Sequence, residues 1–313
     1  MKRTGLIGII LMTMVIVAGC QKEEVPELKQ ETEKEEAVEN ELIQEENPDF
    51  IPEGIRRTKV VREGEDILEI SYEPKEYESS YEYWKVRIPY GSQAVLDTEA
   101  ALSFYQNFAE LDFSNGQKAT AAQKNSVENS QTSFTLEFCQ ADPENERASY
   151  QASADRKLIL HIGETDENGD YYTALETDFD RIYLMKKDVI ESILNVKPFD
   201  LILKISGVCP VDTVDKVMVT VDGKEQELKK EEYQEIYTDL FDVLIVKEME
   251  VKKDNGKELL QLTFLRNVEE AEDLTITYYD YDDQYASVKV NGEEHFLVKK
   301  EDVEKLIQII ESR

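Results

Sequence analysis

The chain has 313 residues and a formal net charge of −32, from 36 Lys and Arg against 68 Asp and Glu. Apolar residues make up 41% of it and aromatic residues 9%, enough for a folded core, so disorder of the whole chain is excluded. The acidity argues against nucleic acid as a partner, because that binding depends on Lys and Arg that neutralise phosphates.

Residues 1–19 have the features of a bacterial lipoprotein signal peptide. Lys2 and Arg3 form a positive n-region, and the apolar h-region that follows is too short to cross a hydrocarbon core. Val17-Ala18-Gly19-Cys20 resembles a lipobox, in which the Cys is lipidated and becomes the first residue of the mature chain. The alternative is an uncleaved anchor. We expect lipidation at Cys20 and a protein held on the extracytoplasmic face of the cell membrane.

Residues 20–50 are predicted to be a disordered acidic tether. Residues 21–50 hold twelve acids against three Lys, a net charge of −9, with no Gly and one aromatic residue. Such sequence cannot offset its ordering entropy and repels itself, so it should stay extended. A cation-binding acidic arm is the alternative.

A folded unit is predicted over residues 51–197. Strands are expected at 57–62, 67–72 and 81–88, followed by an amphipathic helix over 96–113 that Asp97 caps. After a polar stretch, the unit continues with strands at 133–139, 157–162, 171–177 and 181–185 and a helix at 187–194.

Residues 198–313 are predicted to repeat this order. A strand at 216–221 precedes a helix over 231–245, whose apolar face includes Phe241 and Leu244. The remaining elements are strands at 259–265, 273–279, 285–290 and 295–298 and a closing helix at 301–311.

The sequences of the two units can be aligned at two constant differences in residue number. Gly91 and Leu96 fall on Gly223 and Leu228, and residues 183–187 fall on 296–300 at a smaller offset, so the first unit is the longer one. We place the surplus in the polar stretch 114–157, which shows no apolar period. The sequence thus predicts an α+β fold of two tandem copies, each with a helix packed on a mostly antiparallel sheet. Chance similarity of amphipathic helices is the alternative.

The first unit resembles the DUF4340 family of bacterial extracytoplasmic proteins. Trp84 and Pro89 before the helix, Tyr171-Tyr172 in a hairpin and Tyr183-Leu184 before a short helix match its pattern. The resemblance covers about residues 55–195 and, more weakly, 200–311, where the Trp is missing. Members look like membrane-tethered companions of ABC transport systems of the gliding-motility type. The resemblance therefore implies ABC transporter subunits as partners, and it implies no catalytic residues.

Few residues offer reactive chemistry. Cys139 and Cys209 could form a disulfide or stay buried as small apolar groups. His161 and His295 lie in predicted strands, where a surface or packed His is favoured over a metal ligand. We expect no cofactor, no metal site and no catalytic residue.

An acidic turn resembles part of a calcium loop. It contains Glu164, Asp166, Asn168, Gly169 and Asp170, but Leu175 stands where a bidentate Glu belongs. The tip of a β-hairpin explains Asn168-Gly169 with fewer assumptions.

The tyrosines are the remaining candidates for binding. They form two clusters in the sequence, Tyr72, Tyr77, Tyr81, Tyr83 and Tyr90, and Tyr278, Tyr279, Tyr281 and Tyr285. Tyr is enriched at interfaces, but it is also a common half-buried strand residue. We expect a non-enzymatic binding or scaffold module that reaches the membrane through the lipid on Cys20 and assists an ABC-type transport complex. A carboxylate-based cell-envelope hydrolase and a soluble-ligand receptor are the alternatives.

The lipid anchor can be tested directly. Metabolic labelling with a fatty-acid analogue should tag the chain, and Cys20→Ser should abolish the label because the acceptor thiol is lost. Labelling that survives the substitution would contradict the assignment.

Overall fold

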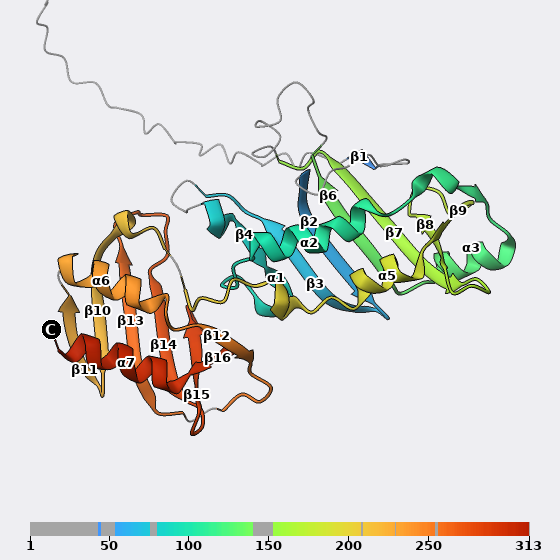
Figure 1. Ribbon diagram of the computed structural model, residues 1–313. Helices are drawn as coiled ribbons and strands as arrows, with labels where there is room; N and C mark the ends of the chain where they lie inside the picture. The colour runs from blue at the N-terminus through green and yellow to red at the C-terminus, as the bar shows by residue number, and fades with distance from the viewer. Residues whose placement is uncertain are drawn as a thin grey trace, which may run out of the picture. The chain divides into compact units, whose positions relative to one another are not determined.

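The computed structural model describes residues 43–44, 54–75, 80–139, 153–207, 209–228, 230–253 and 256–312. Contacts divide the chain into Met1–Glu39 and Asn40–Arg313, and every described residue belongs to the second unit. The predicted signal peptide, Cys20 and most of the predicted tether lie outside the described residues. The described part is of mixed α+β type and contains two antiparallel sheets (Figure 1).

The first sheet runs through residues 55–185. Its hydrogen-bonded order is β4 (Trp84–Val86), β3 (Glu65–Tyr72), β2 (Ile55–Arg62), β6 (Ser133–Phe138), β7 (Arg156–Thr165), β8 (Tyr171–Leu175), β9 (Arg181–Met185) and β5 (Gln117–Lys118). All these neighbours are antiparallel. β1 (Ile43–Gln44) pairs parallel with β7, so these two residues of the predicted disordered tether form a strand instead.

Helices pack on both faces of this sheet. α2 (Thr98–Ala109) and α5 (Lys187–Leu194) lie over one face, where Phe108 of α2 meets Phe134 of β6 with ring centroids 5.8 Å apart. Asp97 caps α2 by accepting from the N–H groups of Glu99 at 3.0 Å and Ala100 at 3.2 Å, as predicted. α3 (Ala121–Glu128) covers part of the opposite face through Val127 and the strand residues Ala174 and Ile182.

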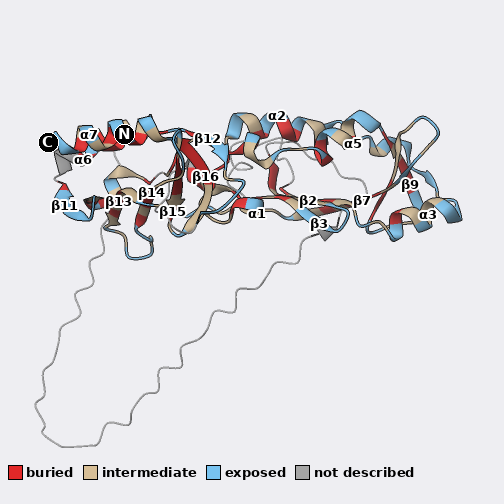
Figure 2. Ribbon diagram, turned by 90° about the horizontal axis from the view of Figure 1, so that it is seen from below, coloured by how far each residue is buried: buried red, intermediate tan, exposed pale blue. Residues whose placement is uncertain are grey.

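The second sheet runs through residues 214–299. Its order is β11 (Lys224–Leu228), β10 (Val214–Val221), β13 (Glu258–Arg266), β14 (Leu274–Asp280), β15 (Tyr285–Val290), β16 (Glu293–Lys299) and β12 (Ile245–Glu248). All neighbours are again antiparallel. α6 (Lys230–Leu240) and α7 (Lys300–Glu311) cover one face, and fully buried residues alternate with half-buried ones along β13, as in a strand with one covered face. Figure 2 shows exposed residues on the outward side of α7.

The strand orders of the two sheets correspond. β3-β2-β6-β7-β8-β9-β5 in the first matches β11-β10-β13-β14-β15-β16-β12 in the second, in the same chain order. The leading hairpins both turn through two residues with positive φ, Glu63-Gly64 and Asp222-Gly223. Gly64 therefore occupies the turn equivalent to Gly223, a place that the sequence alignment gave to Gly91.

Several predicted elements differ from the observed ones. Residues 81–88 were expected as one strand, but the strand covers only Trp84–Val86, between a 3-10 turn, η2 (Ser80–Tyr83), and the short α1 (Arg87–Tyr90). Ile88 adds one isolated bridge to Glu69 of β3. α2 ends at Ala109 instead of residue 113, and Asp112 caps a separate 3-10 turn, η3 (Phe113–Asn115). Within the polar stretch 114–157 the chain forms α3, a helix that the sequence did not predict and whose single buried residue is Val127.

Two connecting segments, residues 95–96 and 202–205, join the sheets. Isolated β-bridges link Lys85 to Val95, Leu96 to Ile202 and Ile205 to Leu244. These bridges continue the hydrogen bonding from β4 to the residue before β12. The N–H of Leu203 donates to the carbonyl of Val95 at 2.8 Å, and that of Ile245 to Lys204 at 2.9 Å. Residues 202–205, which follow the first sheet, are therefore hydrogen-bonded to both sheets. We call this region, together with the turn at Gly91, the junction.

The carboxylate of Glu293 also joins the two sheets at this junction. Glu293 of β16 accepts hydrogen bonds from the N–H groups of Ser92 at 2.9 Å and Gln93 at 3.0 Å and from the Ser92 hydroxyl at 3.1 Å. Gly91 precedes them with φ +76°, and a Cβ there would lie 2.5 Å from Oε1 of Glu293. Successive N–H groups in such a turn form a cradle for an anion, here supplied by the chain itself.

Two glycine substitutions test this junction. Gly91→Ala should lose about 1–2 kcal/mol to its left-handed backbone, and about 1.5–3 kcal/mol more because Glu293 must leave its charged hydrogen bonds. Gly223→Ala is the matched control, since its φ is +72° but nothing lies within 4 Å of the added Cβ. Urea unfolding compares the two, and equal losses of stability would contradict the role of Glu293.

Candidate functional site

Exposed apolar side chains concentrate in one short segment. Five large apolar residues in the described part of the chain are exposed: Leu102, Phe241, Leu244, Val246 and Val251. Four of them fall within residues 241–251, where Leu244 is 46% and Val246 39% exposed. Single exposed apolar residues are ordinary, but a concentration of them marks an interaction surface. We call residues 241–251 the apolar segment.

Local structure explains the exposure. α6 ends at Leu240, and β12 begins at Ile245. Val243 and Ile245 are buried, while Leu244, just before β12, and Val246, within it, are exposed. The two buried side chains anchor this part of the chain, and alternation along an extended chain turns Leu244 and Val246 to solvent. The alternation ends there, because the pairing with β16 shifts register between Ile245 and Lys247. Sequence reasoning missed this site because it continued the helix to residue 245 and placed Phe241 and Leu244 on its buried face.

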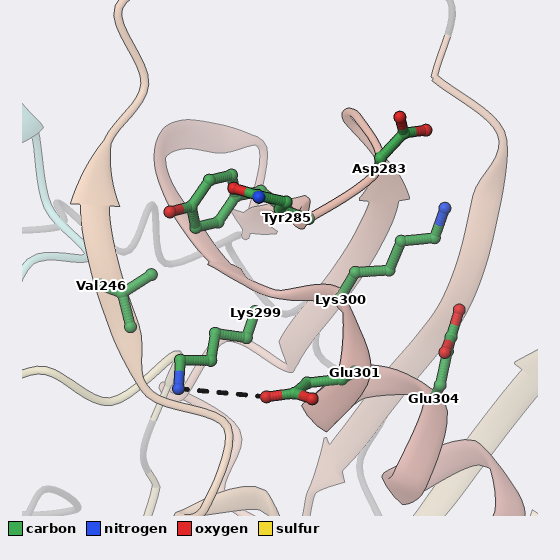
Figure 3. Close-up of a pocket in the computed structure, with 8 residues that line it drawn as sticks. Val246, Asp283, Tyr285, Lys299, Lys300, Glu301 and Glu304 are labelled. Carbon is green, nitrogen blue, oxygen red and sulfur yellow. Dashed lines mark ion pairs between the residues drawn. The ribbon is translucent and has the colours of Figure 1, made fainter.

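A hollow adjoins the apolar segment at Val246. It has a volume of about 530 Å³ and is lined by Val246, Asp283, Gln284, Tyr285, Lys299, Lys300, Glu301 and Glu304. Figure 3 shows Val246 and Tyr285 on one side and Asp283 and Glu304 on the other. Residues from β12, the β14–β15 turn, β16 and α7 thus converge on one surface.

The two lysines of the hollow are already engaged. Nζ of Lys300 lies 2.8 Å from Oδ1 of Asp280, and this hydrogen bond raises the pKa of Lys300. Nζ of Lys299 lies 4.0 Å from Oε1 of Glu301. Asp283 and Glu304 also act on Lys300 and help to raise its pKa. With three carboxylates against two lysines, the lining of the hollow is acidic on balance.

The acidic turn after β7 is the tip of a hairpin. The carboxylate of Asp166 accepts from the N–H groups of Asn168 at 2.8 Å and Asp170 at 3.0 Å, and Gly169 has φ +88°. Asp170 accepts from Nζ of Lys186 at 2.7 Å, which lowers the pKa of Asp170. Its carboxylate is therefore directed to a lysine. No cluster of three or more metal-ligating side chains occurs among the described residues.

The two histidines lie on different sheets. Nε2 of His161 is 3.8 Å from Oε1 of Glu176, and its ring contacts Phe179 edge-on at 5.1 Å. His295 packs against Tyr90 at the junction, with ring centroids 5.8 Å apart, and burial lowers its pKa. Both are packed aromatic residues, and they do not lie together.

Both thiols are buried, and the possible disulfide between Cys139 and Cys209 is not formed. The thiol of Cys139 donates to the carbonyl of Gly54 at 3.4 Å. Burial raises the pKa of Cys209 to about 12 and also raises that of Cys139. A thiol with a raised pKa is a poor nucleophile, because the thiolate is the reactive form.

The tyrosine clusters separate in space. Tyr72 packs on Trp84 at 4.9 Å and on Tyr83 at 5.9 Å, whereas Tyr90 lies at the junction, 4.7 Å from the ring of Phe296. In the second cluster Tyr278 is fully buried, and Tyr285 alone lines the hollow. Tyr77 and the side chain of Tyr81 lie outside the described residues.

A polar cleft of about 260 Å³ offers paired carboxylates, as a hydrolase would need. It is lined by Glu73, Glu82, Arg87 and Arg266, among others. Burial raises the pKa of Glu73, but hydrogen bonds from Arg87 and Ser71 outweigh that effect, and the pKa lies below its ordinary value. Glu73 therefore lacks the raised pKa that a general acid requires.

Comparison with known proteins adds no relative. No protein-family model, curated protein or solved structure matches the chain. Among the residues that the structure describes, no helix is long and apolar enough to span a membrane.

Proposed function

We propose that this protein is a lipid-anchored, extracytoplasmic docking module that assists a membrane transport complex of the ABC type and catalyses no reaction itself. One observation carries the proposal. Four of the five exposed large apolar residues among those described lie in the apolar segment, beside the hollow. Apolar surface kept at one place on a very acidic molecule favours a protein partner.

The predicted anchor supports a partner in the membrane. A lipid on Cys20 would hold the body near the bilayer, and residues 21–42 separate Cys20 from β1, which begins at Ile43. An extended chain of that length spans at most about 75 Å. Tethering raises the effective concentration of a neighbour, so a small surface suffices for binding. The ABC transporter as partner rests on the resemblance to DUF4340.

The proposal includes two tandem copies of one unit, residues 51–197 and 198–313. The matching strand orders of the two sheets support a duplication, and so do the two leading turns with positive φ. The second copy alone carries the apolar segment, since β5, the strand equivalent to β12, is the short Gln117–Lys118. A duplicated unit could keep the fold in one copy and gain a binding surface in the other.

A soluble-ligand receptor is the second candidate. The hollow of about 530 Å³ falls within the size range of small-molecule sites. Its polar, charged lining differs from the apolar lining that such sites usually have, so the docking module is favoured.

Affinity purification tests the docking function. Tagged full-length protein is cross-linked gently and recovered from mild-detergent extracts, and the captured subunits are identified by mass spectrometry. We expect ABC permease subunits, and Leu244→Asp should reduce their recovery about tenfold by placing a charge in the apolar contact.

Leu102→Asp is the matched control, because Leu102 on α2 is 42% exposed and lies outside the apolar segment. It should leave recovery unchanged. Repeated failure to recover permease subunits with intact protein would count against the transport complex. Equal recovery with both variants would count against the apolar segment as the site.

A further inference from the structure

We infer that the hollow and the apolar segment bind a short apolar segment of a partner protein that is flanked by Lys or Arg. This inference rests on the proposed docking function and specifies the chemistry of the partner. It depends on the volume of the hollow, on a lining that is apolar on one side and charged on the other, and on the net charge of the chain.

One side of the hollow suits an apolar side chain. Val246, the ring of Tyr285 and the methylene stem of Lys299 meet there, and Tyr285 and Lys299 are cross-strand partners in β15 and β16. The stem of a lysine covers apolar surface while its amine stays polar, and here the amine is paired with Glu301. A volume of about 530 Å³ has room for a large aliphatic or aromatic side chain.

The rest of the lining suits a cation. Its lining holds the carboxylates of Asp283, Glu301 and Glu304 against the amines of Lys299 and Lys300, and Lys300 is also paired with Asp280, so negative charge is in excess. A Lys or Arg of the partner would pair with these carboxylates at the rim, where charge mainly sets specificity and the rate of association.

Charge also excludes two other occupants. A second copy of the chain would bring a further net charge of −32 against the same acidic rim, and an anionic lipid surface would be repelled for the same reason. A neutral apolar partner would leave the excess of negative charge at the rim unbalanced. A basic, apolar protein segment is the occupant that satisfies both parts of the lining.

The opposite edge of the same sheet provides an internal comparison. β11 exposes Lys224, Glu225, Gln226 and Glu227, the charged and polar surface that protects an edge strand from unwanted pairing. β12, at the other end of the sheet, exposes Lys247 and Glu248 as well as Val246, and Leu244 is exposed just before it. Both edges therefore carry charged side chains, and the β12 edge adds two exposed apolar ones.

Synthetic peptides test the inference with the purified mature protein. Three peptides of equal length are compared by fluorescence anisotropy: one of Leu and Lys, one of Leu and Glu, and one of Ser and Lys. We expect binding of the Leu/Lys peptide alone. Val246→Asp should raise its Kd about tenfold, and Leu102→Asp should leave the Kd unchanged.

Comparing Val246→Asp with Leu102→Asp distinguishes binding at the hollow from non-specific electrostatic attraction of a basic peptide to an acidic protein. Each adds one negative charge at an exposed apolar position, so electrostatic attraction alone would strengthen binding in both. Equal affinity of the two variants, or binding of the Ser/Lys peptide as tight as that of the Leu/Lys peptide, would overturn the inference. If no peptide binds while permease recovery still falls with Leu244→Asp, the partner chemistry is overturned and the docking function stands.

Discussion

The carboxylate of Glu293, held by the N–H groups of Ser92 and Gln93, is the interaction on which the arrangement of this protein depends. It fixes β16 of the second sheet to the turn that follows β4 of the first. β12 lies between β16 and the connecting residues 204 and 205, so this contact also determines where β12 runs. The position of the apolar segment therefore depends on a hydrogen-bonded anion elsewhere in the fold.

The same junction explains how a strand can carry exposed apolar residues without loss of order. Ile245 is buried and bonded to the carbonyl of Lys204, while Tyr90 packs on Phe296 and donates a hydrogen bond to Glu248. Burial and that hydrogen bond raise the pKa of Tyr90, so its hydroxyl remains a donor. With β12 held from both sides, Leu244 and Val246 contribute little to folding and remain available for contact. A rigid surface of this kind binds with a smaller entropy cost than a mobile one.

Local patterns in the sequence predicted most of the fold, and long-range contacts account for what they missed. β9, α5 and β15 begin and end where apolar periodicity placed them, because each period is set by neighbours in the chain. β12 was missed because Tyr237, Phe241 and Leu244 keep helical spacing beyond the true end of α6. Glu293 and Ser92 are 201 residues apart, and no periodic signal links such a pair. The apolar segment and the junction were therefore the parts that only the structure could reveal. Of the predicted tyrosines, Tyr285 lines the hollow and Tyr281 donates a hydrogen bond to the carbonyl of Val251 in the apolar segment.

The apolar segment is proposed as the surface through which this protein contacts its partner in the cell. Photo-cross-linking from single positions tests it most directly, with a photoreactive amino acid at position 246 in one strain and at position 102 in another. The account predicts an adduct with a membrane-complex subunit from position 246 and none from position 102. The same adducts from both positions, or adducts from position 102 alone, would contradict it.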